Sequence, residues 1–230
     1  MLRIGGMVPY SSVDYPGLLS AVVFCQGCSW SCGYCHNSHL RPAHSAAAVT
    51  WTDVHNMLER RRGLLDAVVF SGGEPTLQKD LVAAIRAVRA LGFKVGLHTA
   101  GTNPGRLRRL LPLLDWVGMD IKAPWDEYDR VTGVAGSGLK ALASTRLLLD
   151  SGIQCEFRTT VHSSLLNRAS LEKIGEWLAA RGANNYVLQE YRAEGSAETF
   201  PDMEAGYLDD VGAGALASRF PHFDVRLATV

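Results

Sequence analysis

Four of the five cysteines in this chain of 230 residues fall within eleven positions, and three of them have the spacing C-x3-C-x2-C. Those three are Cys28, Cys32 and Cys35, and Tyr34 stands just before the last one. Thiolates are soft ligands that suit iron–sulfur clusters. Three thiolates on a four-iron cluster leave one iron without a protein ligand. The spacing therefore predicts an open [4Fe–4S] cluster that can bind the amino and carboxylate groups of a small molecule.

Two other interpretations of the cysteines stay open at this point. If Cys25 is counted, the spacing becomes x2, x3, x2, which a four-cysteine zinc site or a closed electron-transfer cluster could use. Zinc sites usually separate their cysteine pairs by a longer linker, and the bacterial ferredoxin spacing also differs. The remaining cysteine, Cys155, stands alone. A disulfide framework is not expected in a cytosolic chain of this size, because its thiols stay reduced.

Apolar, β-branched runs alternate along the chain with segments of helical periodicity. The strands that these runs predict are residues 18–25, 66–71, 93–99, 115–121, 153–161, 184–191 and 222–227. The predicted helices are residues 52–62, 77–91, 103–111, 139–151 and 170–181, with a final helix near 204–219. Residues 192–206 are rich in Glu, Ala, Gly and Ser, which indicates a loop.

This alternation predicts an α/β fold with parallel strands joined by right-handed crossovers. An open doubly wound sheet and a barrel compete, but a complete eight-unit barrel needs about 250 residues. About six units favour a partial (β/α)6 TIM-type barrel. We expect one domain over residues 1–230, with a cluster loop at 25–37, a core barrel at about 18–192 and a C-terminal extension at about 193–230. In either architecture, the chemistry belongs at the carboxyl ends of the strands.

The polar motifs of the chain fall where the predicted strands end. The cysteine loop follows the strand at 18–25, and the sequence Gly72-Gly73-Glu74 follows the strand at 66–71, which ends at Ser71. Later strand ends carry His98, Thr99, Asp120, Lys122, Arg158, Thr160 and Gln189. Before this context is considered, a Lys or Arg at a strand end is more often a surface charge, and His98 also suits a hydrogen-bonded core imidazole.

These motifs together resemble a known family. The C-x3-C-x2-C spacing with Tyr34 is similar to the signature of the radical S-adenosylmethionine (SAM) superfamily. The segments 12–17 (SVDYPG), 26–28 (QGC) and 35–37 (CHN) resemble those of the glycyl-radical-enzyme activating proteins. Within this family, the resemblance is closest to the group that activates anaerobic ribonucleoside-triphosphate reductase. It runs from about residue 7 to residue 192.

The resemblance implies a reaction and its partners. An external one-electron reductant such as flavodoxin or ferredoxin reduces the cluster, and SAM bound at the open iron is cleaved to methionine and a 5′-deoxyadenosyl radical. That radical removes a hydrogen atom from a glycine of a glycyl radical enzyme, which we expect to be anaerobic ribonucleotide reductase. No protein general base is required. The alternatives are a small-molecule radical SAM enzyme similar to 7-carboxy-7-deazaguanine synthase, and a non-enzymatic iron–sulfur or zinc module.

The resemblance also implies roles for the residues at the strand ends. The motif Gly72–Glu74 would receive the SAM amino group, because glycines let carbonyls approach an ammonium and Glu74 adds a negative charge. Lys122 and Arg158 resemble groups that contact SAM, whose carboxylate is an anionic target. Thr160 and Gln189 occupy positions that line the adenine. These are expectations from the family and not from spacing.

His98 stands where pyruvate formate-lyase activating enzymes tend to carry Asp, so their monovalent cation site does not carry over directly. Thr99 and Asp120 remain as candidate ligands for such a cation. Tyr34 is expected among the cofactor contacts. Cys25 occupies a position that is often apolar in the family, so we expect a buried cysteine at a strand end and not a cluster ligand.

The composition excludes several functional classes. Lys plus Arg and Asp plus Glu both number 23, so the chain lacks the positive charge that nucleic acid or an anionic membrane attracts. Residues 1–10 include no long apolar segment with a cleavage site, and no stretch approaches the roughly 18 apolar residues of a membrane span. We therefore expect a cytoplasmic protein that binds neither nucleic acid nor membrane.

Overall fold

The computed structural model describes residues 2–44, 49–196, 198–201, 203, 206–208 and 216–228. Its strands form one sheet in which neighbours follow the order of the sequence, from β1 to β8. The strands are β1 (Ile4–Ser11), β2 (Ser20–Cys25), β3 (Ala67–Gly72), β4 (Lys94–Thr99), β5 (Trp116–Asp120), β6 (Gln154–Val161), β7 (Asn185–Glu190) and β8 (His222–Arg226). Strands β2 to β8 are parallel. The predicted α/β fold with a mostly parallel sheet is confirmed.

Strand β1 was not predicted from the sequence. It pairs antiparallel with β2, with irregular register between Ile4 and Gly6 and between Val8 and Ser11. Its sequence includes Gly5, Gly6 and Pro9, which lower strand propensity. An edge strand tolerates these residues because it pairs on one side only.

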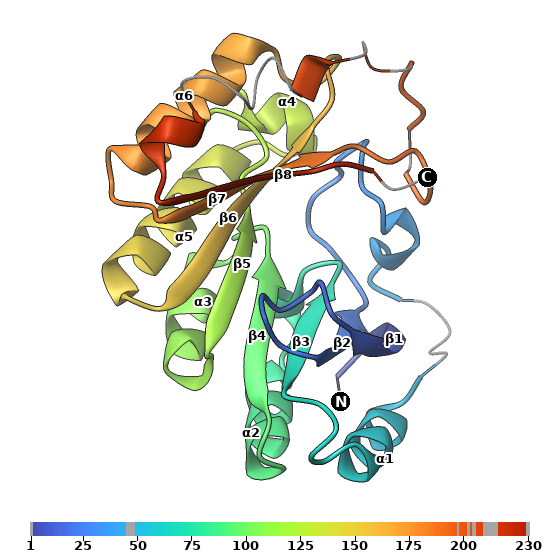
Figure 1. The fold of residues 1–230 in the computed structure, drawn as a ribbon. Coiled ribbons are helices and arrows are strands. Elements are labelled where there is room, and N and C mark those ends of the chain that lie inside the picture. Colours follow the sequence, from blue (N-terminus) through green and yellow to red (C-terminus); the bar gives the residue numbers. More distant parts are fainter. Residues whose placement is uncertain are drawn as a thin grey trace.

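Helices cover the outer face of the sheet (Figure 1). They are α1 (Trp51–Arg60), α2 (Leu81–Ala90), α3 (Pro104–Leu110), α4 (Tyr128–Thr132), α5 (Ser137–Ser151) and α6 (Arg168–Ala179). The short helix α4 was not predicted. The helix expected near 204–219 lies largely outside the described residues, which include the 3-10 turn η4 (Ala217–Arg219) at its end. Among the described residues, no helix combines the length and the apolarity needed to cross a membrane.

The core fills both faces of the parallel strands. The runs Ala21–Val23 and Ala67–Phe70 are completely buried, as expected for strands covered on both sides. On the outer face, Val23 and Phe70 belong to the large core beneath the helices. On the inner face, the loop between β1 and β2 places the ring of Tyr15 at 5.2 Å from that of Trp116. Apolar packing therefore closes the inner side of the sheet below its carboxyl edge.

The sheet does not close into a full barrel. Among the described strands, β1 and β8 each pair with one neighbour, so they form the two edges of a partial barrel. Figure 1 shows the segment after β2 lying between these edges. The carboxyl ends of β2 to β7 all meet on this side, because parallel strands end at the same edge.

Candidate functional site

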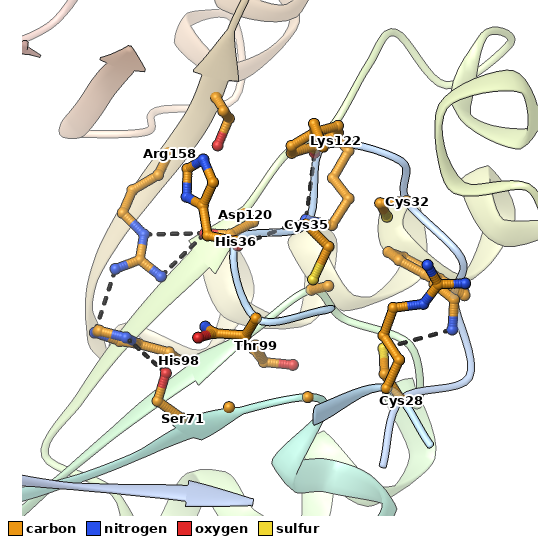
Figure 2. A pocket seen from close by; sticks show the side chains of 18 of the residues that line it. Cys28, Cys32, Cys35, His36, Ser71, His98, Thr99, Asp120, Lys122 and Arg158 are labelled. Carbon is orange, nitrogen blue, oxygen red and sulfur yellow. Dashed lines mark hydrogen bonds and ion pairs between the residues drawn. The ribbon is translucent and has the colours of Figure 1, made fainter. Parts of the chain in front are cut away.

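A cavity of about 370 Å³ lies where the cysteine loop meets the carboxyl ends of the strands (Figure 2). It brings together every site residue predicted from the sequence except Glu74. The lining includes Cys28, Cys32, Tyr34, Cys35, Gly72, Gly73, His98, Thr99, Asp120, Lys122, Arg158, Thr160 and Gln189. These residues come from segments spread over most of the chain, so the rule that chemistry gathers at strand ends accounts for their meeting.

The cysteine loop is closed by backbone hydrogen bonds between its two ends. The amide of Gly27 donates to the carbonyl of Leu40 at 2.7 Å, and that of Cys28 donates to Arg41 at 3.0 Å. In the middle of the loop, Ser31 donates to the carbonyl of Thr132 at the end of α4, at 2.8 Å. The two ends of the loop are therefore held together and its middle is attached to the end of α4, so the three thiols are carried on a constrained segment.

The thiol of Cys25 does not line the cavity. Cys25 ends β2, is fully buried and packs in the large core. Burial raises the pKa of its thiol far above the ordinary value. The structure thus places Cys25 apart from Cys28, Cys32 and Cys35, as a core residue.

The glycine pair packs the end of β3 against the start of the cysteine loop. Gly72 has a φ of +108°, and a Cβ there would come within 2.5 Å of the Cys25 backbone nitrogen. A Cβ on Gly73 would lie 2.5 Å from the carbonyl oxygen of Gly27. The Gly73 amide donates to the Cys25 carbonyl at 2.9 Å. These positions need glycine because two backbones touch there, and both glycines still line the cavity.

Glu74 differs from the expectation that its charge faces a ligand. Its side chain is completely buried and does not line the cavity. Its carboxylate accepts hydrogen bonds from the Thr76 amide at 3.0 Å, from the Thr99 hydroxyl at 2.8 Å and from the Ala100 amide at 3.0 Å. Burial raises the pKa of this carboxyl, although the hydrogen bonds act in the opposite direction. Glu74 therefore ties the end of β3 to the end of β4 from behind the cavity.

The carboxylate of Asp120, at the end of β5, lies between two cations, Arg158 within β6 and Lys122 just after β5 (Figure 2). Arg158 Nε and Nη2 both lie 3.0 Å from Asp120 Oδ1, and Lys122 Nζ lies 3.6 Å from Asp120 Oδ2. Burial acts to raise the pKa of Asp120, but the two cations outweigh it and hold that pKa below its usual value. The cluster carries a net positive charge that faces the cavity.

Lys122 points from the end of β5 toward the cysteine loop. Its Nζ lies 3.4 Å from the Tyr34 hydroxyl and 5.3 Å from the centre of that ring. Burial favours the neutral amine, but Tyr34, Cys32 and Asp120 outweigh burial and raise the pKa of Lys122 well above its ordinary value. Lys122 is therefore an ammonium held next to the thiols, and its charge stabilises the thiolate form of nearby cysteines.

His98 is locked as a neutral imidazole. Its Nε2 lies 2.9 Å from the Asp14 carbonyl oxygen and its Nδ1 lies 3.3 Å from the Ser71 hydroxyl. Burial, with the Arg158 guanidinium 3.2 Å from Nε2, lowers the pKa of His98 to about 3. A positive charge already lies beside this ring, so the geometry does not offer His98 as a ligand for a monovalent cation.

We expect His98 to make the protein less stable in acid. The unfolded chain takes up a proton on this imidazole below its ordinary pKa of about 6.5, whereas the folded chain does not, so its contribution is fully present above about pH 6.5 and is lost as pH falls toward 3. Between about pH 8 and pH 5.5, the free energy of unfolding should fall by about 1.4 kcal/mol more in the wild type than in His98→Asn. Urea unfolding at the two pH values measures the free energy of unfolding of each protein. An equal change between the two pH values in both proteins would contradict the prediction.

Comparison with known proteins assigns this chain to a family. Residues 22–177 match the family model described as the radical SAM superfamily. The chain belongs to the radical SAM superfamily. Enzymes of this superfamily use a [4Fe–4S] cluster and SAM, so this chain is a radical SAM enzyme.

Three relatives illustrate the match. A Methanocaldococcus jannaschii protein provisionally named a glycyl-radical enzyme activating enzyme is 32% identical over 195 residues, which are 82% of this chain and 79% of the relative. The pyruvate formate-lyase 1-activating enzyme of Escherichia coli is 31% identical over 172 residues, covering 69% of this chain and 67% of that enzyme. The structure of Streptococcus suis SuiB bound to SAM has a TM-score of 0.70 at 14% identity, covering 89% of this chain and 48% of SuiB. That structural likeness concerns the fold alone.

The donor set of the cavity fits the cluster that radical SAM enzymes carry. Three soft sulfur donors, Cys28, Cys32 and Cys35, line one cavity. Among the described residues, no group of three His, Cys, Asp or Glu side chains comes close enough together to hold a single metal ion. Three thiolates are the ligands that a [4Fe–4S] cluster with one open iron needs, so the sulfur donors present fit such a cluster.

Several residues that line the radical SAM cavity were not predicted as site residues. They are Asp14, Trp30, His36, Asn37, Arg41, Ser71 and Arg192, among others. Arg192 stands two positions after the end of β7, so the strand-end rule could have found it. Asp14 belongs to a loop before β2, and no local pattern places that loop over the carboxyl edge of β4.

A segment after β7 holds the radical SAM cysteine loop from outside, and we call it the strap (residues 192–196 and 198). The Arg192 amide donates to His36 Nε2 at 3.1 Å, and the Ser38 hydroxyl donates to the carbonyl of Gly195 at 2.8 Å. The Glu198 amide donates to the carbonyl of Gly33 at 3.0 Å. The strap therefore restrains the part of the loop on either side of Cys35.

The strap depends on glycine at position 195. A Cβ there would come within 2.2 Å of the His36 carbonyl oxygen, whereas Gly182 has a similar positive φ and open space around it. We expect Gly195→Ala to displace the strap, at a cost of about 1–3 kcal/mol, and to speed iron release from the reconstituted protein to a chelator several-fold. Gly182→Ala is the matched control for backbone strain. Equal release rates in the two variants would show that the strap does not restrain the loop.

Proposed function

We propose that this radical SAM enzyme activates a glycyl radical enzyme by removing a hydrogen atom from a glycine of that partner. The observation that carries the proposal is a single cavity in which three thiols face Lys122 and Arg158. The names of the Methanocaldococcus jannaschii and Escherichia coli relatives support a protein glycine as the hydrogen donor. When bound, the cluster and SAM supply the electron transfer and the radical chemistry.

The residues of the chain would then bind the cluster and SAM and orient them relative to each other. Cys28, Cys32 and Cys35 would hold three irons of the cluster. The ammonium of Lys122 and the guanidinium of Arg158 suit the carboxylate of SAM, which is the anionic end of that molecule. Their geometry is rigid, because Asp120 holds both cations from one side.

The other contacts of SAM follow from the same cavity. Gly72 and Gly73 expose backbone at the end of β3, which suits the SAM amino group. Thr160 on β6 and Gln189 on β7 are neighbours in the sheet and suit the adenine, since their side chains can hydrogen-bond its ring edge. Tyr34 lines the same cavity and its hydroxyl lies 3.4 Å from Lys122 Nζ, so it would orient that ammonium toward bound SAM.

We propose that the partner reaches the first cavity through a second one. It has a volume of about 210 Å³ and shares His98, Arg158, Thr160 and other residues with the first cavity. Its outer lining includes Val13 and Leu227, which are 78% and 62% exposed and flank the two edges of the partial barrel. A loop of a partner protein that carries the target glycine can enter here. Among such partners we propose anaerobic ribonucleotide reductase, with a flavodoxin or ferredoxin as the cytoplasmic reductant.

Electron paramagnetic resonance tests the proposed function. The reconstituted enzyme is incubated anaerobically with SAM, a reductant and anaerobic ribonucleotide reductase, and a glycyl-radical doublet is expected on the reductase. A Cys32→Ala variant is the control that should give no doublet. Release of 5′-deoxyadenosine without any doublet would exclude this reductase, and a small-molecule substrate would then be the better hypothesis. The absence of both signals would favour a non-enzymatic cluster module.

A further inference from the structure

Trp30 is the middle residue of the three that separate Cys28 from Cys32. Its indole is 2% exposed, although Ser29 and Ser31 on either side are exposed. Its backbone amide lies 3.4 Å from the sulfur of Cys28. The loop therefore turns this one large side chain inward, where it lines the same cavity as the three thiols.

Aromatic packing explains why the ring of Trp30 is buried, but it does not explain why the ring carries an indole N–H. The ring of Trp30 meets that of Tyr128 edge to face, with 5.7 Å between centroids. The Tyr128 hydroxyl is already engaged, because it accepts from the Lys122 amide at 3.0 Å and lies 3.4 Å from the Asp120 carbonyl oxygen. An aromatic contact alone would be satisfied equally well by phenylalanine.

The indole nitrogen of Trp30 is buried without a hydrogen-bond partner among the described residues. One other buried side-chain nitrogen or oxygen shares this condition there, the hydroxyl of Thr102. A hydroxyl can rotate or accept a bond, whereas an indole N–H is a donor only and its ring is fixed. A buried donor that lacks an acceptor costs free energy, so it points to an acceptor that arrives with a ligand.

We propose that the indole N–H of Trp30 donates a hydrogen bond to a sulfur of the bound cluster, either a cysteine thiolate or an inorganic sulfide. Thiolates of the neighbouring residues are the acceptors that the cavity gains when the cluster forms. The inference rests on the ligands proposed above, Cys28, Cys32 and Cys35, and not on the identity of the protein substrate. Trp30 then tunes the cluster as a hydrogen-bond donor.

The consequence concerns the reduction potential of the cluster. One-electron reduction adds negative charge to the sulfurs, so a donor to sulfur stabilises the reduced cluster more than the oxidised one. Trp30 thus raises the potential and makes the cluster easier to reduce by a mild physiological donor. Its loss shifts the potential in the negative direction without removing a ligand.

The pair Trp30→Phe and Trp125→Phe isolates the N–H from the ring. Both tryptophans pack on Tyr128 with 5.7 Å between centroids, but Trp125 does not line the cavity. In redox titrations of the reconstituted proteins, followed by electron paramagnetic resonance, we expect a more negative midpoint potential for Trp30→Phe and the wild-type value for Trp125→Phe. Formation of 5′-deoxyadenosine should slow in Trp30→Phe with a mild reductant and recover with a strong one. A wild-type potential in Trp30→Phe, at full iron content, would overturn the proposal.

A second measurement needs no variant that might fail to hold the cluster. Wild-type protein labelled with ¹⁵N in the tryptophan indoles is reduced, and hyperfine spectroscopy is used to detect a ¹⁵N coupling and an exchangeable proton at the cluster. We expect both signals, and the ¹⁵N coupling should persist in Trp125→Phe. Their absence from the wild type would reject the hydrogen bond whatever the variants do. Neither measurement uses a partner enzyme, so this inference can fail while the proposed glycyl-radical activity stands, and the reverse.

Discussion

Alanine in place of Cys28, Cys32 or Cys35 is expected to abolish the cluster, with iron and sulfide falling to background and 5′-deoxyadenosine formation lost. Each thiol lines the one cavity, and the fit of a four-iron cluster there leaves no spare sulfur donor. The remaining pair of thiols cannot hold the cluster against exchange with water and chelators, because each iron–thiolate bond contributes to a shared geometry. Iron and sulfide analysis with the absorbance of the reconstituted proteins measures the effect.

Cys25→Ala is the matched control for this series. It removes a thiol that is at most ten residues from the other three in sequence, but that lies in the core and outside the cavity. We expect it to keep its iron and its activity, with a loss of stability of about 1 kcal/mol from the small cavity it leaves. Iron loss in Cys25→Ala comparable to that of the other three would refute the assignment of ligands and would favour a closed cluster.

Lys122→Ala is expected to weaken SAM binding by about 10- to 100-fold while the cluster remains intact. A charge-assisted hydrogen bond to a buried carboxylate contributes about 1.5–3 kcal/mol, and each 1.4 kcal/mol changes the affinity about tenfold. Lys122 is 12% exposed and its charge is oriented by Asp120 and Tyr34, so little reorganisation is needed when a ligand arrives. Equilibrium binding of SAM to the anaerobic protein, normalised to its iron content, gives the affinity.

The control for Lys122 is an ordinary surface lysine. Lys173 on α6 is 57% exposed and pairs with Asp126 at 2.8 Å, away from the cavity. Lys173→Ala should bind SAM like the wild type. If Lys122→Ala bound SAM equally well at full iron content, Lys122 would have no direct role in binding SAM. The charge of Lys122 would then only stabilise the thiolate form of the nearby cysteines.

The parts of the site that depend on near neighbours in the chain could be read from the sequence. The spacing of Cys28, Cys32 and Cys35 is local, and the apolar runs that end at Gly72 and Thr99 carry their own strand signal. The strand-end rule then brings these segments together without a structure, because parallel strands must end at one edge. The same rule predicts Gln189 at the site, whereas Thr160 was expected there from the family resemblance, and the two are neighbours across β6 and β7.

Features with weak or misleading local signals were missed. Strand β1 includes glycines and Pro9, and only pairing with β2 makes it a strand. Glu74 belongs to a motif whose family role suggests a charge facing a ligand, yet Thr99 and Ala100 of another strand end turn its carboxylate into the protein. The direction of a side chain depends on partners that a local motif does not include.

The sequence alone determined the chemistry of this protein: three soft donors on one short loop, and the order of strands and helices that carries them. Tertiary structure decided which groups face the cavity. Ser38 and Gly195 meet across 157 positions of the chain. That the N–H of Trp30 has no acceptor in the described part of the chain becomes evident only when its surroundings are known. The physical reason is that spacing and periodicity are local properties, whereas hydrogen-bond satisfaction and burial are sums over neighbours that folding brings together.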